Sequence, residues 1–311
     1  MTATPVEPTN AGGVVVVGSA NADLVLRLAE LPRPGETRLA TDTSRLPGGK
    51  GANQAVAAAR SGASTRLIAA IGDDADGALV SEALVAAGVD VRLVRTSSAP
   101  TGLALVLLDD HGHNSIVVAP GANATIEQLR PDERDVVRDG AVLLCQLEMP
   151  LPVVIEAAQT ARAAGRIVVV NAAPSEPLPD ALVAAVDVLV VNEHEASEIA
   201  GTADLDRAVD MLLTRVPAVV VTLGAAGARV AERTGSRRLL PAPAVQVVDT
   251  TGAGDTFCGV FAAGLAARTS MTAAAERAIA AASLSVQRLG AIPSIPRAEE
   301  IAAAMTKAGS S

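Results

Sequence analysis

The segment from Val248 to Phe257, VDTTGAGDTF, combines a glycine-rich turn with an acidic residue at the start of an apolar helical pattern. Glycines at a helix N-terminus leave backbone N–H groups free to bind an anion, and the helix dipole favours negative charge there. The run Gly252–Gly254 therefore predicts an anion hole, with phosphate as the expected ligand. Asp255 follows directly, and a carboxylate beside a phosphate is unfavourable unless it takes a proton from an attacking hydroxyl group. The spacing supports equally well an Asp255 that only caps the helix.

A second glycine-rich segment, PGGKGANQ over 47–54, also precedes a predicted helix. Its glycines allow the backbone to approach a small ligand closely. Lys50 is one of two lysines in a chain with 23 arginines, which indicates that this position needs a compact ammonium group. The alternative is a glycine-rich turn with a solvated lysine. The spacing of a Walker A loop is absent, and no dinucleotide fingerprint follows the first predicted strand.

Further polar side chains stand at the ends of predicted strands. Asn192 and Glu195 lie three apart at the start of a helix and so project to one side. An amide and a carboxylate suit Mg²⁺ held largely through water and phosphates, although an Asn cap beside surface acids is the alternative. Asn21 and Asp23 follow the first strand, and Glu148 follows another. Because open α/β sheets bind ligands beyond the carboxyl ends of their strands, these side chains suit a polyhydroxylated small molecule.

The remaining reactive side chains predict no chemistry. His111 and His113 have no third ligand nearby and are interpreted as loop residues, and His194 as a surface residue. Cys145 and Cys258 lie far apart and make no metal-ligand pattern. They are expected to be reduced, mostly buried thiols of a cytoplasmic protein.

Composition excludes several classes of protein. The chain has 311 residues, of which 50% are hydrophobic and 19% charged, enough to build a core. Its net charge of −9, without any Lys/Arg-rich run, argues against nucleic acid or an anionic membrane as the main partner. Apolar stretches are far shorter than the roughly 20 residues of a membrane-spanning helix. Residues 1–12 are expected to form a disordered tail without a secretory signal.

Short apolar runs alternate with Ala-rich helical patterns, which predicts an α/β doubly wound, mostly parallel sheet with flanking helices over residues 13–311. The expected strands are Val14–Gly18, Leu67–Ile71, Ala141–Cys145, Ile167–Asn171, Val188–Asn192 and Ala218–Leu223. The expected helices are Ala52–Ser61, Gly77–Ala87, Pro152–Ala164, Gly254–Ala267, Met271–Arg288 and Arg297–Lys307. A small separate sheet over the main domain, drawn from about 21–46 and 100–119, is expected from Asp23–Leu28, Thr37–Arg45, Gly102–Leu108 and Asn114–Val118.

The two glycine-rich signatures resemble those of the PfkB-type carbohydrate kinases, also called the ribokinase family. The resemblance runs from about Val14 to the C-terminal helix and includes agreement at Gly18–Asp23, Gly121–Ala124, Gln146–Glu148 and Thr222–Gly224. It implies an α/β domain covered by a β-sheet lid, through which members often form homodimers. It also implies phosphoryl transfer from MgATP to a sugar, with O5 of D-ribose as the first expectation.

The resemblance also implies a role for individual residues. Asp255 corresponds to the base that takes the proton from the sugar, and Gly252, Ala253 and Gly254 to the anion hole. The residues expected to contact the sugar are Asn21, Asp23, Gly49, Lys50, Asn53, Glu148 and Asp255. Those expected to contact ATP are Asn192, Thr222, Gly224, Gly227 and Gly254, with Asn192 and Glu195 near Mg²⁺ through water and phosphate.

A monovalent-cation site, usually for K⁺, is implied as well. The matching positions are Asp249, Thr251, Ser285, Arg288, Gly290 and Ser294. Where some relatives place His or Asn near the adenine, this chain has Ile279–Ala282, so an apolar adenine contact is expected.

Two alternatives to a D-ribose kinase stay open. The first is a kinase of the same family for another sugar, such as deoxyribose or a hexose, or for a nucleoside. A nucleoside is the weaker choice, because the chain has no Trp or Tyr and only Phe257 and Phe261 for base stacking. The second is a non-catalytic sugar-binding regulator, which would be expected to lack the base or the anion hole.

Overall fold

The chain is described here by a computed structural model that covers residues 12–109, 111 and 113–308. Its centre is a nine-stranded sheet in the order β13-β12-β11-β10-β9-β8-β1-β4-β5. The parallel strands are β1 (Val14–Val17), β4 (Thr65–Gly72), β5 (Val94–Ser97), β8 (Val142–Cys145), β9 (Ile167–Asn171), β10 (Val188–Asn192) and β11 (Ala218–Thr222). Two antiparallel strands, β12 (Ala228–Glu232) and β13 (Arg237–Leu240), complete one edge.

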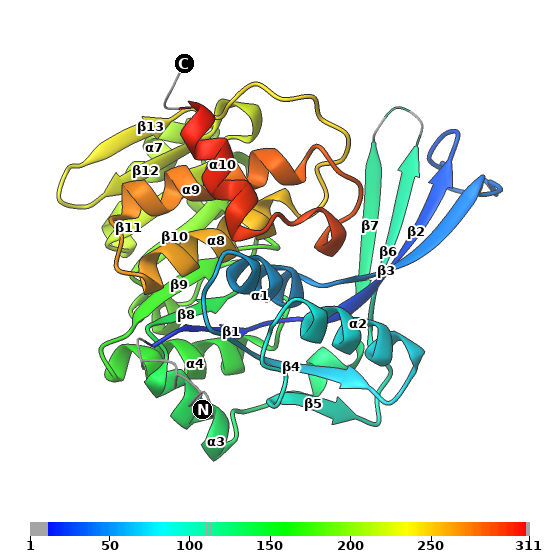
Figure 1. The fold of residues 1–311 in the computed structure, drawn as a ribbon, viewed down its shortest axis with the longest axis horizontal. Helices are drawn as coiled ribbons and strands as arrows, with labels where there is room; N and C mark the ends of the chain where they lie inside the picture. Colours follow the sequence, from blue (N-terminus) through cyan, green and yellow to red (C-terminus); the bar gives the residue numbers. More distant parts are fainter. Residues whose placement is uncertain (1–11, 110, 112, 309–311) are drawn as a thin grey trace, which may run out of the picture.

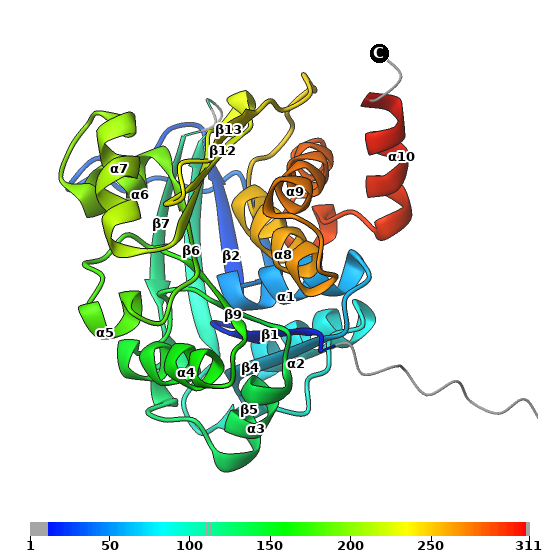
Figure 2. The same ribbon diagram turned by 90° about the vertical axis from the view of Figure 1, so that its left-hand side faces the viewer.

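Helices cover both faces of this sheet (Figures 1 and 2). One face packs against α1 (Lys50–Arg60), α2 (Ala75–Ala86), α8 (Ala253–Ala266) and α9 (Met271–Ser285), and α10 (Ala298–Ala308) packs on the outer side of α9. The other packs against α3 (Pro131–Asp139), α4 (Leu151–Ala163), α5 (Asp180–Val183), α6 (Glu193–Ala200) and α7 (Leu205–Arg215). Successive strand residues point to opposite faces, so Val14 and Val16 join one buried cluster and Val15 and Val17 the other. This is why the central strands are apolar without alternation.

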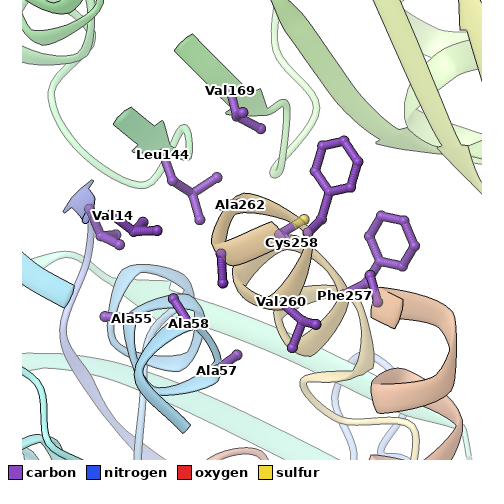
Figure 3. Packing of buried hydrophobic residues seen from close by; sticks show 14 of the residues in the cluster. Val14, Ala55, Ala57, Ala58, Leu144, Val169, Phe257, Cys258, Val260 and Ala262 are labelled. Carbon is purple, nitrogen blue, oxygen red and sulfur yellow. The ribbon is translucent and has the colours of Figure 1, made fainter. Parts of the chain in front are cut away.

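Small residues allow α1 and α8 to pack closely. A side chain at Gly259 would lie 2.3 Å from the backbone oxygen of Gln54 and 2.6 Å from Cβ of Ala57, so only glycine fits there. Ala57 and Ala58 of α1 lie beside Val260 and Ala262 of α8 (Figure 3). The close approach brings the N-terminal turns of the two helices, which carry the two glycine-rich motifs, to one place.

A separate four-stranded sheet in the order β3-β2-β6-β7 stands beside the body of the molecule (Figure 1). Its strands are β2 (Asn21–Leu28), β3 (Asp42–Gly48), β6 (Gly102–Asp109) and β7 (Asn114–Ala119). Asn21 pairs with Gly48 on one side and with Gly102 on the other, and Leu103 pairs with Ala119. All four strands therefore meet the main domain along one line. The predicted fold class, a mostly parallel α/β sheet with a second small sheet, is confirmed.

The structure corrects several predicted boundaries. The strand expected at Thr37–Arg45 is β3, Asp42–Gly48, because β3 is an edge strand that tolerates Pro47 before its end. Helix α9 ends at Ser285 rather than Arg288. Elements absent from the prediction are β5, β12, β13, α3, α5, α7 and the short 3₁₀ helices at Gly121–Thr125, Gly224–Ala226 and Ile292–Ser294, whereas α6 is the helix expected to start at Asn192 and Glu195. The predicted tail, apart from Gly12, lies outside the described residues. No helix of the described part of the chain is long and apolar enough to cross a membrane.

Candidate active site

A polar pocket of about 160 Å³ lies at the carboxyl ends of β9, β10 and β11. The N-termini of α1, α6 and α8 converge on it, so three helix dipoles direct positive potential toward its interior. Its lining consists of Lys50, Asn171, Ala173, Val190, Val191, Asn192, Glu195, Thr222, Gly252, Gly254, Asp255 and Cys258. The structure thus brings together residues of three segments that the sequence singled out separately.

Asp255 is buried in the first turn of α8, with each carboxylate oxygen held by an amide. Asn53 donates from Nδ2 to Oδ2 at 2.9 Å, and Gln54 donates from Nε2 to Oδ1 at 2.9 Å. The N-cap residue of α8 is Gly252, and no side chain caps this helix. The alternative in which Asp255 serves as a helix cap is therefore wrong, and its carboxylate is free to act in the pocket.

Of the three residues predicted to form an anion hole, Gly252 and Gly254 are placed where a ligand could reach them. Gly252 adopts a left-handed conformation with φ of 72°, and Gly254 has no heavy atom within 4 Å of the position a Cβ would take. Both line the polar pocket. Ala253 does not line it, and its N–H donates to the backbone oxygen of Thr250 at 3.2 Å. The first-turn N–H groups of Gly254 and Asp255 are the better placed donors, because helix geometry gives them no partner within the helix.

Lys50 is held beside carboxylates rather than solvated in a turn. Its Nζ lies 3.9 Å from Oε1 of Glu148, and its side chain is 31% exposed. Oε2 of Glu148 accepts hydrogen bonds from Oγ of Ser19 at 2.5 Å and from N of Lys50 at 3.3 Å. Burial disfavours the ammonium, but the charges of Asp255, Glu148 and Glu195 outweigh it and raise the pKa of Lys50. Lys50 thus keeps its positive charge in a cluster of acids.

Asp23 is the most perturbed carboxyl group of this cluster. Burial raises the pKa of Asp23 from 3.8 to about 7, with help from the negative charges of Glu148 and Asp255, while Lys50 opposes the shift. A Cβ at Gly48 would lie 2.2 Å from Oδ2 of Asp23, so the glycine leaves room for this carboxyl group. A carboxyl group that is half neutral near pH 7 can donate as well as accept a hydrogen bond.

Of the predicted sugar contacts, Lys50 and Asp255 line the polar pocket, whereas Asn21, Asp23, Gly49, Asn53 and Glu148 do not. Asn21 is buried, and its Oδ1 accepts a hydrogen bond from Nδ2 of Asn123 at 2.7 Å. Gly49 is the N-cap of α1, with φ of 90°. Oδ1 of Asn53 is buried without a hydrogen-bond partner among the described residues. An unpaired buried acceptor is costly, which favours a ligand that donates to it.

Sequence reasoning missed four residues of this network: Ser19, Gln54, Gln146 and Asn171. Gln54 donates from Nε2 to Oδ1 of Asn171 at 3.0 Å as well as to Asp255, and it accepts from Nε2 of Gln146 at 2.6 Å. Ser19, Gln54 and Gln146 lie inside segments that resemble the family, so these segments could have indicated them. What the motifs could not show is contact between positions 92 and 201 residues apart.

Asn192 and Glu195 form the reciprocal capping box of α6. Oδ1 of Asn192 accepts from N of Glu195, and Oε2 of Glu195 accepts from N of Asn192, both at 2.8 Å. The capping alternative is thus confirmed. Both residues also line the polar pocket, and burial raises the pKa of Glu195. Nδ2 of Asn192 and Oε1 of Glu195 do not take part in the box, so a role near Mg²⁺ stays a prediction.

A larger apolar pocket of about 550 Å³ adjoins the polar one, and Thr222 and Gly254 line both. Its lining includes the predicted nucleotide residues Thr222, Gly224 and Gly227, together with Phe257, Ile279, Ala282 and the loop residues Ala242–Val245 and Val247. This composition suits a flat apolar group such as a base, with the polar end of the ligand directed toward Gly254.

The predicted monovalent-cation residues surround the loop that leads into Gly252. Asp249 accepts from N of Thr251 at 2.9 Å and from N of Gly290 at 2.8 Å. Although burial raises it, these hydrogen bonds hold the pKa of Asp249 below its ordinary value. The hydroxyl groups of Ser285 and Ser294 donate to backbone oxygens, and the side chain of Arg288 pairs with Glu300. At Ser285, Arg288 and Ser294, a cation could therefore be bound by backbone oxygens or by the lone pairs of the two serine hydroxyl groups.

Residues set aside on sequence grounds lie as expected. His113 and His194 are 73% and 78% exposed and pair with Asp109 and Glu198. Cys145 and Cys258 are buried free thiols, and burial raises the pKa of both. Within the described residues, no three His, Cys, Asp or Glu side chains are arranged to hold a metal ion.

Comparison with known proteins agrees with this geometry. Residues 12–298 match the model of the pfkB family carbohydrate kinases. The chain is 39% identical over 296 residues to the ribokinase of Haemophilus influenzae, covering 92% of this chain and 96% of that one. It is 38% identical over 298 residues to the ribokinase of Arabidopsis thaliana, covering 91% and 78%. The structure of Arabidopsis thaliana ribokinase complexed with ribose and ATP superimposes with a TM-score of 0.89 at 37% identity, covering 94% of this chain and 98% of that one. The chain belongs to the pfkB family of carbohydrate kinases.

Proposed function

We propose that this protein is a ribokinase, which transfers the terminal phosphoryl group of ATP to O5 of D-ribose. The observation that carries the proposal is the position of Asp255, whose carboxylate lines the polar pocket where that pocket joins the larger apolar one. A nucleotide with its base in the apolar pocket would direct its phosphates into the polar pocket at Gly254, one residue from this carboxylate. The similar structure of Arabidopsis thaliana ribokinase, which is complexed with ribose and ATP, supports this proposal.

In this mechanism the sugar lies among Asn21, Asp23, Gly49, Lys50, Asn53 and Glu148. The carboxylate of Asp255 orients the O5 hydroxyl and accepts its proton during attack on the phosphorus atom. The N–H groups at the start of α8, with Gly252 and Gly254 leaving space for the ligand, stabilise charge on the phosphoryl oxygens. The protein contributes mainly positioning and charge stabilisation, as phosphoryl transfer requires. Movement of the small sheet over the sugar would exclude water as a competing acceptor.

We include Mg²⁺ and K⁺ among the cofactors. Asn192 and Glu195 would face Mg²⁺ through water and phosphate, which suits an amide and a single free carboxylate oxygen. Mg²⁺ supplies charge neutralisation on the phosphates. K⁺ would lie against the backbone of the segments at Asp249–Thr251, Ser285–Gly290 and Ser294, and would set the shape of the loop before Gly252.

We also infer a homodimer formed through the small sheet, and a cytoplasmic location. The sheet exposes the apolar side chains of Ile116, Val117 and Val118, which are 53%, 67% and 40% exposed. A reducing compartment suits Cys145 and Cys258, which are buried free thiols.

The test is a coupled assay of ADP formation with a panel of pentoses, hexoses and nucleosides. We expect the highest kcat/KM with D-ribose, and a lower value with 2-deoxyribose because the missing hydroxyl leaves a polar group of the site unpaired. Each unpaired buried group costs about 1–3 kcal/mol. Equal values for the two sugars would contradict the assignment of ribose and leave the kinase assignment standing. No ADP formation with any acceptor would favour the sugar-binding regulator.

A further inference from the structure

The side-chain amide of Gln54 lies in the protein interior, where glutamine is uncommon. It lies one turn into α1, is completely shielded from solvent, and does not line the polar pocket. A buried amide destabilises the fold unless its N–H and C=O groups are hydrogen-bonded. An apolar side chain would serve packing alone, so the partners of Gln54 must explain its presence.

These partners form a chain of buried amides that ends at the candidate base. Nε2 of Gln146 donates to Oε1 of Gln54 at 2.6 Å, and both glutamines are 0% exposed. Nε2 of Gln54 then donates to Oδ1 of Asp255 at 2.9 Å and to Oδ1 of Asn171 at 3.0 Å. Each link joins a different element, since Gln54 lies in α1, Asn171 ends β9 and Asp255 opens α8.

These hydrogen bonds fix which way the side-chain amide of Gln54 is oriented. If it were turned round, its oxygen would face two acceptor oxygens, those of Asp255 and Asn171, and its amino group would face the amino group of Gln146. The network therefore keeps a donor toward Asp255. Asn53 donates to the other oxygen, so the two amides fix the plane of the carboxylate. A carboxylate has about four acceptor positions, so it can still accept a substrate proton.

We propose that Gln54, held by Gln146, is a positioning residue that holds the Asp255 carboxylate by a donated hydrogen bond and aims it at the sugar hydroxyl. The proposal rests on the proposed function, in which Asp255 is the base. Gln54 lines neither pocket, so its effect on the site would pass through the two pocket-lining residues that it contacts, Asp255 and Asn171.

Other charged and titratable groups also act on Asp255. They are Asp23 of β2, Lys50 of α1, Glu195 of α6 and Cys258 of α8. None of them changes when Gln54 is substituted. A shift in the pH dependence of turnover between wild type and a Gln54 variant therefore reports the lost amide contact.

The test compares Gln54→Met and Gln54→Glu with wild type, using Gln159→Met as a matched control on the exposed surface of α4. We expect Gln54→Met to lower kcat by about 10- to 100-fold, because misplacement of a reacting group costs that much. KM for D-ribose and ribose binding by calorimetry should change little.

The acid limb of the pH profile of kcat/KM should move to higher pH, since a donor to the ionised carboxylate is lost. Gln54→Glu should move it further, because two adjacent carboxyl groups share a proton. The control should match wild type.

A Gln54→Met enzyme with the kcat and the acid limb of wild type would overturn the proposal. A loss of kcat with an unmoved acid limb in both variants would also overturn it, because it would indicate a packing defect. If Gln54→Met does not fold, the same readouts on Gln146→Met, which removes the hydrogen bond that holds Oε1 of Gln54, decide in the same way. Failure of the proposed function would look different, since wild type itself would then show no ribose-dependent ADP formation.

Discussion

At the scale of single residues, the site concentrates like charges that water would normally separate. The charges of Glu148 and Asp255 help to raise the pKa of Asp23, and Lys50 is the cation among these carboxyl groups. Such a cluster costs stability in the empty protein. It is useful if a sugar with several hydroxyl groups then supplies donors to it, because the same low dielectric strengthens each new hydrogen bond.

Replacing Asp255 by Asn should separate binding from turnover. The amide keeps the size of the side chain but cannot take the proton, and loss of a general base costs about 10²- to 10⁴-fold in rate. We expect kcat to fall by this amount while calorimetry still detects ribose binding. Asp139→Asn, an exposed aspartate at the end of α3, is the control and should behave as wild type. A rate within tenfold of wild type would show that Asp255 is not the base.

The raised pKa of Asp23 predicts a dependence of stability on pH. In the unfolded chain this group loses its proton near pH 3.8, whereas in the folded protein it keeps the proton up to about pH 7. Folding therefore binds a proton between these values, and the contribution of Asp23 to stability falls as pH rises through this window. Asp23→Asn cannot ionise and escapes this loss.

Thermal unfolding of wild type and Asp23→Asn from pH 4 to pH 8 checks this. The difference in Tm, variant minus wild type, should increase by a few degrees toward pH 8. Asp139→Asn should show no such trend. A difference that stays flat or decreases would mean that Asp23 ionises in the folded protein as readily as in water.

At the scale of elements, glycine places the start of α8. Gly252 has φ of 72°, and a Cβ there would lie 2.9 Å from Cβ of Ala291. We expect Gly252→Ala to lose about 1–2 kcal/mol of stability from the left-handed conformation, and to lower kcat and raise KM for ATP because the first turn of α8 must shift. Gly165 has a similar conformation, with φ of 70°, and a Cβ there would have no heavy atom within 4 Å. Gly165→Ala is therefore the matched control and should lose stability without losing activity. Equal activity of the two variants would contradict the role of this turn.

The loop before Gly252 should respond to a monovalent cation. Asp249 ties Thr251 to Gly290, so an ion against these backbones would stiffen the path into α8. We expect K⁺ to raise kcat relative to tetramethylammonium at equal ionic strength, and Asp249→Asn to reduce this response. Identical rates in the two salts would remove the cation site from the mechanism.

How far the elements could be predicted depended on their burial. Strands β9 and β10 were predicted with their observed bounds, because both faces are apolar and turn residues bound them. β13 was missed because Arg237–Leu240 includes two arginines and is mostly exposed, so it shows no apolar run. The amide chain was missed because an isolated Gln54 or Gln146 has no distinctive sequence environment. Only the packing of α1 against α8 and the sheet shows that these amides meet.

At the scale of the whole molecule, two apolar clusters stabilise the main domain, one on each face of the nine-stranded sheet. The small sheet belongs to neither, apart from residues beside its attachment. A partner surface that covered the exposed apolar residues of this four-stranded sheet would stabilise it.

This exposure leads to a prediction on assembly. Val117→Glu, in an edge strand of the small sheet, should convert a dimer into a monomer, because a buried unpaired carboxylate at an interface is strongly unfavourable. Sedimentation velocity measures the change. Leu239→Glu, at a residue of β13 that is 62% exposed, is the matched control outside the small sheet and should leave the dimer intact. A wild type that is monomeric at all concentrations would contradict the inferred homodimer.

The single line of attachment of the small sheet gives it the mechanics of a lever. A strand of eight residues such as β2 is about 26 Å long at roughly 3.3 Å per residue. A rotation of about 10° at the attachment would therefore sweep the far end through about 5 Å, in the range of hinge motions, while Asn21 and Gly48 at the fulcrum hardly move. Of the side chains predicted to contact the sugar, Asn21 and Asp23 belong to β2 and lie at its attached end. The sheet can thus open widely to solvent without altering the distances on which recognition of the sugar depends.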